Sequence, residues 1–496
     1  MKKDRILVIP FLIAATLLSF YPCSYAEVLQ NQTYPAYKAQ NYEMLQNALA
    51  EQKRQLVFFL SDVQRRAMKI KKDEFTLSFF KTIHAFKSVK NIENFPNKLV
   101  RKTDQLKKQY EEHFIVNYLS FYDLLFIDSK GAIFYTIRKQ KDYNMNIFEG
   151  QLENTALSKK MKTSPSTSFV DFQFYEISGE PSAFFIEPVK DEKEQIGWVV
   201  LQFSIDKINN MFCLAQEIGK TYEIFLVNRS KYMLTDSRFI TESTILKEQL
   251  AEENIAAKFN VRKGHKEVTD YRGHKVLSTF EVFNFLGSEW LIISKIDEEE
   301  LFTNYFKQHP EKLTEILEKA LSQERESYHK GKLSIDSGIE VDMDEFRRND
   351  DDRFLYTHGV SSCTAFIIKK LSDFTYFAHI SPFDKVYGEN RTDLMEHMLK
   401  KIEYLEVTES EKHKLYFYIV SPSSAAFEAI IKRLMKHGYF LSQIKIIHYK
   451  RAAYANVSSK NNRKEVLVNW KMNKDLYYLE SSNERANLQS LMREIM

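Results

Sequence analysis

The chain has 496 residues, with 71 Lys and Arg, 67 Asp and Glu, and a formal net charge of +4. A chain of this length is too long for a single hydrophobic core, so we expect about three globular domains. Charges of both signs are interspersed, which excludes the broad basic surface of a nucleic-acid-binding protein. With 13 Gly and 10 Pro, the composition is that of a folded protein rather than a fibrous or disordered one.

The first 26 residues have the pattern of a secretory signal peptide. Three basic residues precede an apolar stretch from Ile6 to Phe20, and Ser24-Tyr25-Ala26 supplies small residues for cleavage. The apolar stretch is shorter than the roughly twenty residues of a spanning helix. We therefore expect a periplasmic or secreted protein. An uncleaved N-terminal anchor is the alternative, and only then would the chain have a membrane partner.

Two cysteines, Cys213 and Cys363, follow the predicted cleavage site. Two cysteines in an exported chain of this size do not form a disulfide framework. They also fall in segments that we expect to belong to different domains. The sequence therefore favours two free thiols.

Residues 42 to 125 have mainly helical spacing of apolar positions, and Pro96 is expected to divide them into two long helices. Strand-like segments with alternating apolar positions follow, separated by polar turns. The first block of strands comprises residues 121–128, 132–138, 181–189 and 195–205. The second block comprises residues 221–228, 232–239, 269–282 and 288–297.

The second block resembles the membrane-proximal half of the double Cache sensor domains of bacterial chemoreceptors. The residues that carry the resemblance are YEIFLVN at 222–228, LTDSRF at 234–239, DYRG at 270–273, EWLII at 289–293 and Ile296-Asp297. Gly179-Glu180-Pro181 and Gly197-Trp198-Val199-Val200 match the distal half. The resemblance covers about residues 40 to 305. It implies two PAS-like antiparallel-sheet modules, a distal one at about 120–212 and a proximal one at about 220–297.

The resemblance also implies a small-molecule ligand, with the distal module as the better pocket. Tyr135, Asp171 and Tyr175 are polar or aromatic residues on strands of that module, so they are candidate ligand-binding residues. Core or surface positions are an equal alternative for all three.

Residues 298 to 332 are charged throughout and contain no apolar stretch of spanning length. Pro310 suits the first turn of an amphipathic helix, so residues 306–331 are expected to form a helical connector. A separate α/β domain is predicted for residues 332–496. Its expected strands are 354–360, 363–369, 374–380, 414–420 and 444–450, and its expected helices are 391–406 and 425–436.

The turn before Cys363 contains one glycine and two small hydroxyl residues, Gly359, Ser361 and Ser362. Backbone can approach a bound group closely at such a turn, and its amides can stabilise an oxyanion. A neighbouring imidazolium stabilises a thiolate, so a histidine close to Cys363 is expected to hold it as a reactive thiolate and then to supply a proton to the leaving group. The alternative is an ordinary buried thiol beside a hydrogen-bonded histidine.

This cluster resembles CheD, the chemoreceptor glutamine deamidase. Thr357, Cys363 and His379 match the family's threonine, cysteine and histidine at similar spacing, over about residues 332 to 475. The resemblance implies a cysteine nucleophile, a histidine base and a threonine that holds the histidine. It further implies a protein substrate with an accessible glutamine, which would become glutamate with release of ammonia.

The remaining histidines and acidic residues have no metal-ligand spacing, so we expect neither a metal nor another cofactor. The fold class predicted from the sequence is α/β (α+β), with long N-terminal helices, two PAS-like modules and a CheD-like domain. The predicted function is an exported ligand sensor with a cysteine-dependent deamidase domain. The alternative is a non-catalytic extracytoplasmic sensor or adaptor.

Overall fold

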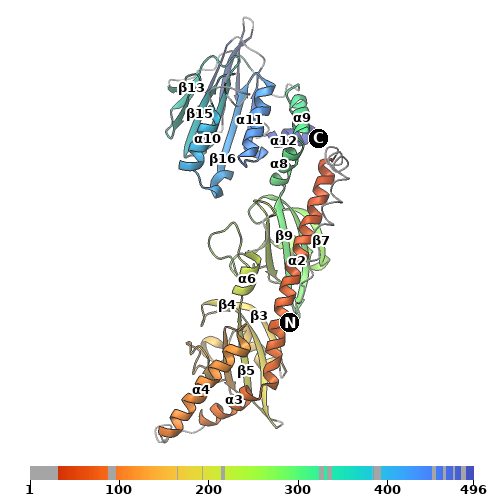
Figure 1. The fold of residues 1–496 in the computed structure, drawn as a ribbon, viewed down its shortest axis with the longest axis vertical. Helices are drawn as coiled ribbons and strands as arrows, with labels where there is room; N and C mark the ends of the chain where they lie inside the picture. The colour runs from red at the N-terminus through yellow and green to blue at the C-terminus, as the bar shows by residue number, and fades with distance from the viewer. Residues whose placement is uncertain are drawn as a thin grey trace, which may run out of the picture. The chain divides into compact units, whose positions relative to one another are not determined.

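The computed structural model describes residues 32–87, 97–164, 166–192, 194–213, 218–322, 329–331, 338–382, 384, 393–449, 454–461, 465–472, 475–481 and 488–495. The predicted signal peptide, residues 1–26, lies outside these ranges. The chain divides into two compact units, residues 39–297 and residues 298–496 together with the segment up to Lys38. Helices and largely antiparallel sheets are mixed in both units behind a long N-terminal helix, which confirms the α/β (α+β) class (Figure 1).

Within the described residues, three α-helices precede the first strand: α2 (Tyr34–Lys69), α3 (Glu74–Lys87) and α4 (Asn97–Tyr118). The prediction of two helices was wrong because a break at Asp73 had no proline to mark it. The short turn η1 (Ile70–Lys72) ends α2, and the Asp73 carboxylate then accepts hydrogen bonds from the Thr76 amide at 3.3 Å and hydroxyl at 2.9 Å. A side chain that satisfies amides at a helix start stabilises that start. Pro96 lies outside the described residues.

The distal half of the first unit is an antiparallel five-stranded sheet of order β2-β1-β5-β4-β3. Its strands are β1 (Asp123–Asp128), β2 (Ile133–Thr136), β3 (Ser168–Tyr175), β4 (Glu180–Asp191) and β5 (Glu194–Ser204), with helices α5 (Ala156–Thr163) and α6 (Asp206–Cys213) and the turn η3 (Gly150–Leu152). Aliphatic and aromatic side chains from all five strands form one buried core. Asp171 and Tyr175 were expected to lie on strands, but the sequence pattern gave no bounds for strand β3. Its polar residues interrupt the alternation of apolar positions.

The proximal half is a four-stranded antiparallel sheet of order β6-β9-β8-β7. Its elements are β6 (Glu223–Asn228), α7 (Glu252–Val261), β7 (Lys263–Thr269), β8 (Lys275–Phe285) and β9 (Ser288–Asp297). The strand expected at 232–239 is absent from the described structure, where Tyr232 and Met233 form only isolated bridges. The Asp236 carboxylate and the Thr244 hydroxyl accept backbone amides there at 2.8 Å, and such side-chain bonds replace a strand ladder.

The second unit begins at the residue after β9. Helix α8 (Glu298–Gln308) follows directly, and α9 (Pro310–Ser322) starts at Pro310, as its spacing predicted. Helix α9 packs against α11 (Ser424–Lys436) and the terminal α12 (Leu488–Ile495). These contacts group α8 and α9 with the C-terminal domain.

Two sheets face each other in that domain, and helices cover the outer face of one of them (Figure 1). The first sheet has the order β12-β15-β14-β16-β17 and the second the order β10-β20-β19-β18-β13-β11. The shared core holds side chains from both sheets, including Cys363. The strands are β10 (His329–Lys330), β11 (Gly338–Glu340), β12 (Phe346–Asn349), β13 (Phe354–Thr357), β14 (Thr364–Lys370), β15 (Phe374–Ile380), β16 (Leu415–Ser421), β17 (Ile444–His448), β18 (Tyr454–Lys460), β19 (Val466–Met472) and β20 (Asp475–Ser481). The helical elements are α10 (Leu394–Leu405), η5 (Glu409–Lys414), α11, η6 (Leu441–Gln443) and α12.

Among the described residues, no helix combines the length and the apolar character needed to cross a lipid bilayer.

Candidate functional sites

The three residues of the predicted catalytic cluster come together between the two C-terminal sheets. Thr357 ends β13, Cys363 precedes β14, and His379 lies near the end of β15. In the antiparallel pair β14/β15, Ala365 stands opposite His379. Because side chains alternate along a strand, Cys363 and His379 are diagonal neighbours on one face of the sheet. Both are buried, and that face looks into the shared core.

The Thr357 hydroxyl determines the tautomer of His379. It donates to the carbonyl oxygen of Val341 at 2.6 Å and lies 2.7 Å from Nδ1 of His379. A hydroxyl has a single proton, and a carbonyl can only accept. The bond to His379 therefore runs from Nδ1–H to the Thr357 oxygen, and the lone pair of the neutral ring is on Nε2. Nε2 is buried and has no hydrogen-bond partner.

The backbone around His379 fixes the position of the ring from the other side. Its amide donates to the Glu345 carbonyl at 3.1 Å, and its carbonyl accepts from the Asp344 amide at 2.8 Å. The Asp344 carboxylate in turn accepts from the Ser381 amide at 3.0 Å. A histidine held at both the backbone and Nδ1 has little freedom to rotate.

The electrostatics of the pair favour two neutral groups. Burial raises the pKa of the Cys363 thiol, although a hydrogen bond from Ser362 lowers it in part. Burial lowers the pKa of His379, against the opposing effect of Asp344 and Asp342. The resting pair is thus a thiol and a neutral imidazole rather than a thiolate and an imidazolium. In the described structure no hydrogen bond joins Sγ of Cys363 to the His379 ring.

The turn before Cys363 needs its glycine. Gly359 has φ +74°, a left-handed conformation that residues with a Cβ adopt only under strain. The turn is anchored by the Val360 amide, which donates to the Ala455 carbonyl at 2.9 Å, and by the Ser361 amide, which donates to Gly359 at 2.7 Å. Ser362 and Cys363 then lead into β14. The turn therefore presents the cysteine at the start of the strand.

A second cluster, which we call the distal acidic cluster, consists of Asp123, Asp142 and Gln202. All three side chains are fully buried in the distal module. Asp123 and Gln202 stand opposite each other on β1 and β5. Asp142 accepts a hydrogen bond from the Tyr175 hydroxyl at 3.0 Å. Like charge from Asp142 acts on Asp123, so the two carboxylates lie within electrostatic range of each other.

One oxygen of each side chain in the distal acidic cluster lacks a partner. Oδ1 of Asp123 accepts three backbone amides at 2.7 to 3.1 Å, but Oδ2 accepts none. Oδ1 of Asp142 and Oε1 of Gln202 are likewise buried without a donor. Neither carboxylate forms an ion pair within the described ranges. Burial raises the pKa of Asp123 to about 7 and raises the pKa of Asp142 as well. Buried acceptors of this kind are rare unless something supplies donors.

The three predicted ligand-binding residues lie in different environments. Tyr175 contacts the distal acidic cluster through Asp142. Tyr135 is buried against Phe79 of α3, with ring centres 5.1 Å apart, and its hydroxyl has no partner. Asp171 accepts the Trp290 indole N–H at 3.0 and 3.1 Å, which joins the distal strand β3 to the proximal strand β9.

Sequence reasoning missed Asp123 and Asp142. For Asp123 a clue was present, because it is the one charged residue at the start of the otherwise apolar strand DLLFI. Asp142 lies in a polar loop between Lys141 and Tyr143, where its sequence context resembles any solvated turn. Only the fold brings its carboxylate into the module interior.

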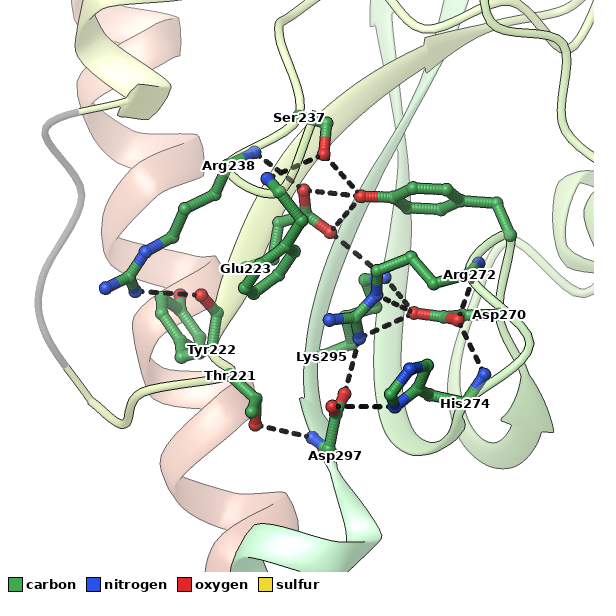
Figure 2. A network of polar contacts seen from close by, with 12 residues as sticks. Thr221, Tyr222, Glu223, Ser237, Arg238, Asp270, Arg272, His274, Lys295 and Asp297 are labelled. Atoms are coloured by element: carbon green, nitrogen blue, oxygen red, sulfur yellow. Dashed lines mark hydrogen bonds and ion pairs between the residues drawn. The ribbon is translucent and has the colours of Figure 1, made fainter. Parts of the chain in front are cut away.

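The proximal module contains a buried charged network (Figure 2). Lys295 contacts the carboxylates of Glu223, at 3.0 Å, and of Asp270. Arg272 joins Asp270 to Asp297, the last residue of β9. The Tyr271 hydroxyl donates to Glu223 at 2.9 Å, and His274 lies 3.3 Å from Asp297. Each carboxylate here thus has a cation or a hydroxyl as its partner.

Within the described part of the chain, no group of three His, Cys, Asp or Glu side chains is arranged to hold a metal ion.

No protein-family model matches the sequence. A comparison with curated proteins gives no match either.

Three of the solved structures that partly match this chain are an extracellular receptor, a histidine kinase sensor domain and a chemoreceptor ligand-binding domain. One is an extracellular ligand binding receptor from Desulfohalobium retbaense DSM5692, at 15% identity and a TM-score of 0.35 over 52% of this chain. The present chain spans 40% of that receptor. The sensor domain of the V. cholerae histidine kinase DctB matches at 12% identity and a TM-score of 0.35, over 52% of this chain and 97% of that one. The ligand-binding domain of the Pseudomonas fluorescens chemoreceptor CtaA in complex with L-isoleucine matches at 13% identity and a TM-score of 0.34. This match covers 57% of this chain and 99% of that one.

Proposed function

We propose that this chain is an exported sensor protein whose C-terminal domain is a cysteine-dependent protein-glutamine deamidase. The observation that carries the enzymatic part is the state of His379. Its Nδ1–H is committed to Thr357, and its Nε2 lone pair is buried, unpartnered and on the same sheet face as Cys363. That is the arrangement a general base for a thiol requires. The sequence resemblance to CheD supports the same assignment.

The chemistry proceeds from a neutral pair. Nε2 of His379 takes the thiol proton as Sγ of Cys363 forms a bond to the carboxamide carbon of glutamine. Amides of the turn, those of Ser362 and Cys363, are the candidate donors to the resulting oxyanion. His379 returns the proton to the nitrogen as the C–N bond breaks and ammonia leaves. Water, deprotonated by the same ring, then hydrolyses the thioester to give glutamate and the free thiol.

The test is mass spectrometry of glutamine-containing proteins after incubation with the full chain, which detects the small mass gain of amide-to-acid conversion. Cys363→Ala and His379→Gln should abolish the conversion, and Cys213→Ala should leave it unchanged, since Cys213 is exposed at the end of α6 in the other unit. Conversion that survives Cys363→Ala would refute the proposed nucleophile.

The sensing part of the proposal assigns the distal module as the ligand site. The distal acidic cluster supports it, because three buried oxygens without donors fit a ligand that brings N–H groups and positive charge. An amine or the ammonium group of an amino acid has this chemistry. Calorimetric titration of the full chain with simple amines and amino acids tests it. Asp142→Asn should weaken binding about tenfold or more, and equal affinity of wild type and variant would contradict the assignment.

One observation favours the alternative of a non-catalytic sensor or adaptor. Cys363 belongs to the buried core between the two sheets, and its pKa is raised. On that alternative, Cys363→Ala costs about 1 kcal/mol of stability and changes no activity. The rate at which iodoacetamide labels Cys363 separates the two functions. A catalytic thiol should be labelled at a rate that changes when His379 is replaced. A packed thiol should be labelled slowly in the native wild type and in the His379 variant alike.

A further inference from the structure

Lys258, on α7, is a buried cation that the proximal charged network does not use. The residue is 5% exposed, and Nζ lies 5.6 Å from the centre of the Phe280 ring on β8. Among the described residues no carboxylate or other acceptor contacts this ammonium. Lys295, by contrast, is held by two carboxylates. A buried ammonium without a counter-ion is costly, so its persistence requires an explanation.

The strand register places the surroundings of Lys258 on one sheet face. Ser278 of β8 stands opposite Lys295 of β9 on one side and opposite Lys266 of β7 on the other. Directly opposite residues share a face, and so does Phe280, two positions along β8. Burial lowers the pKa of Lys258 to about 8, and the charges of Lys295 and Lys266 act in the same direction.

Ser278 adds an independent observation. Its side chain is 1% exposed, and its hydroxyl oxygen is buried without any hydrogen-bond partner. A hydroxyl is a donor as well as an acceptor, and a buried unpaired one is uncommon in a folded protein. An unused donor therefore stands on the same sheet face as the Phe280 ring that Lys258 covers.

Two buried carboxylates of the module, those of Glu223 and Asp270, are engaged by other groups. Glu223 is bonded to Tyr271 and Lys295, and Asp270 to Lys295 and Arg272. The region of Lys258, Lys266 and Ser278 is thus left with excess positive charge and an unused donor. Both the positive charge and the unused donor are complementary to a bound anion.

We propose that the proximal module binds a small organic carboxylate, with the Lys258 ammonium as its counter-ion and the Ser278 hydroxyl as a hydrogen-bond donor. The Phe280 ring that Lys258 covers belongs to a core cluster of aromatic and aliphatic side chains, which suits the carbon skeleton of an organic acid better than an inorganic anion. This site is separate from the distal acidic cluster, and its ligand is an anion rather than a cation. Each of the two proposals can therefore be tested and refuted without the other.

Calorimetric titration of the full chain with sodium propionate, L-lactate and benzoate tests the proposal, against sodium chloride at matched ionic strength. We expect saturable binding of at least one acid by the wild type. Lys258→Met should weaken it roughly 10- to 100-fold, because a charge-assisted bond is lost. Ser278→Ala should weaken it about fivefold. The matched control is Lys275→Met, which removes an exposed lysine from the same strand as Ser278 and should bind as the wild type does.

Asp123→Asn, which alters the distal acidic cluster, should also keep wild-type carboxylate affinity. The thermal unfolding of ligand-free Lys258→Met shows whether this variant is folded. Removal of an unpaired buried charge should leave the thermal midpoint of the ligand-free protein equal or higher. Failure of all three acids to bind, an equal effect of sodium chloride, or unchanged affinity in a folded Lys258→Met protein would each overturn the proposal.

Discussion

At the scale of single residues, Thr357 has a role that its chemistry makes easy to isolate. Its one hydroxyl links the Val341 carbonyl to Nδ1 of His379. Thr357→Val keeps the shape but leaves both partners unpaired in a buried site, which should cost about 1–3 kcal/mol of unfolding free energy. It also removes the preference for a proton on Nδ1. Thr357→Ser should restore both properties. Urea denaturation and nitrogen NMR of the imidazole tautomer are the measurements, and equal behaviour of the two variants would contradict this role.

Asp123 is expected to make stability depend on pH. Its folded pKa of about 7 lies above the ordinary value of 3.8. Between these two values the folded state holds more protons than the unfolded state, so the free energy of unfolding falls as the pH rises through this window. Asp123→Asn should flatten that dependence, by on the order of a few kcal/mol. Urea denaturation at pH 5 and pH 8 measures it. Asp104→Asn, at an exposed position on α4, serves as the control. A wild-type protein that is more stable at pH 8 than at pH 5, with no change in Asp123→Asn, would show the expectation to be wrong.

The identity of these site residues could be predicted from the sequence only in part. The threonine, cysteine and histidine could be singled out because their types and order are distinctive, and their roles stay predictions. The expected thiolate and imidazolium are disfavoured, because burial raises the pKa of Cys363 and lowers the pKa of His379. The actual protonation state could not be foreseen. It depends on burial between two sheets, and one of those sheets contains strands β18 to β20, which the sequence pattern did not indicate.

At the scale of elements, the bond between Asp171 and Trp290 connects the two modules of the first unit. Asp171 lies on β3 and Trp290, fully buried, on β9. Asp171→Ala leaves the indole N–H unpaired and should destabilise the unit by about 1–3 kcal/mol. Asp171→Asn keeps an acceptor and should cost less. Chemical denaturation followed by tryptophan fluorescence distinguishes the variants. If the alanine and asparagine variants are equally stable, the hydrogen bond does not contribute.

The regular hairpins were predictable and the irregular elements were not. Strands β15 and β9 match their predicted ranges because apolar residues dominate or alternate within them and polar turns bound them. The strand predicted at 232–239 does not form, because Asp236 and Ser237 accept hydrogen bonds from the nearby backbone amides of Thr244 and Phe239. The Thr244 hydroxyl, in the loop that follows, also accepts the Ser237 amide. Asp73 ended a helix for the same reason, without a proline or glycine to indicate it.

At the scale of the whole molecule, the compartment remains a prediction from the N-terminal sequence. Fusion of a reporter that is active only in the cytoplasm, placed after residue 322 or after Met496, should give no activity if the chain is exported. A reporter that is active only after export should work at both positions. Cytoplasmic activity at either position would contradict export, and export would exclude cytoplasmic receptor domains as substrates of the C-terminal domain.

The unit of residues 39–297 is, in sequence, an insertion within the C-terminal unit, and this limits how the protein can be divided. Tyr34 at the start of α2 packs on Phe302 with ring centres 5.1 Å apart, and Tyr305 donates a hydrogen bond to the Gln32 carbonyl at 2.9 Å. A chain truncated to begin at Glu298 would therefore expose the aromatic face of α8 to water and tend to aggregate. Joining residues 32–38 to Glu298 through a flexible linker would keep that face covered. Replacement of residues 39–297 by another domain would follow the same two junctions.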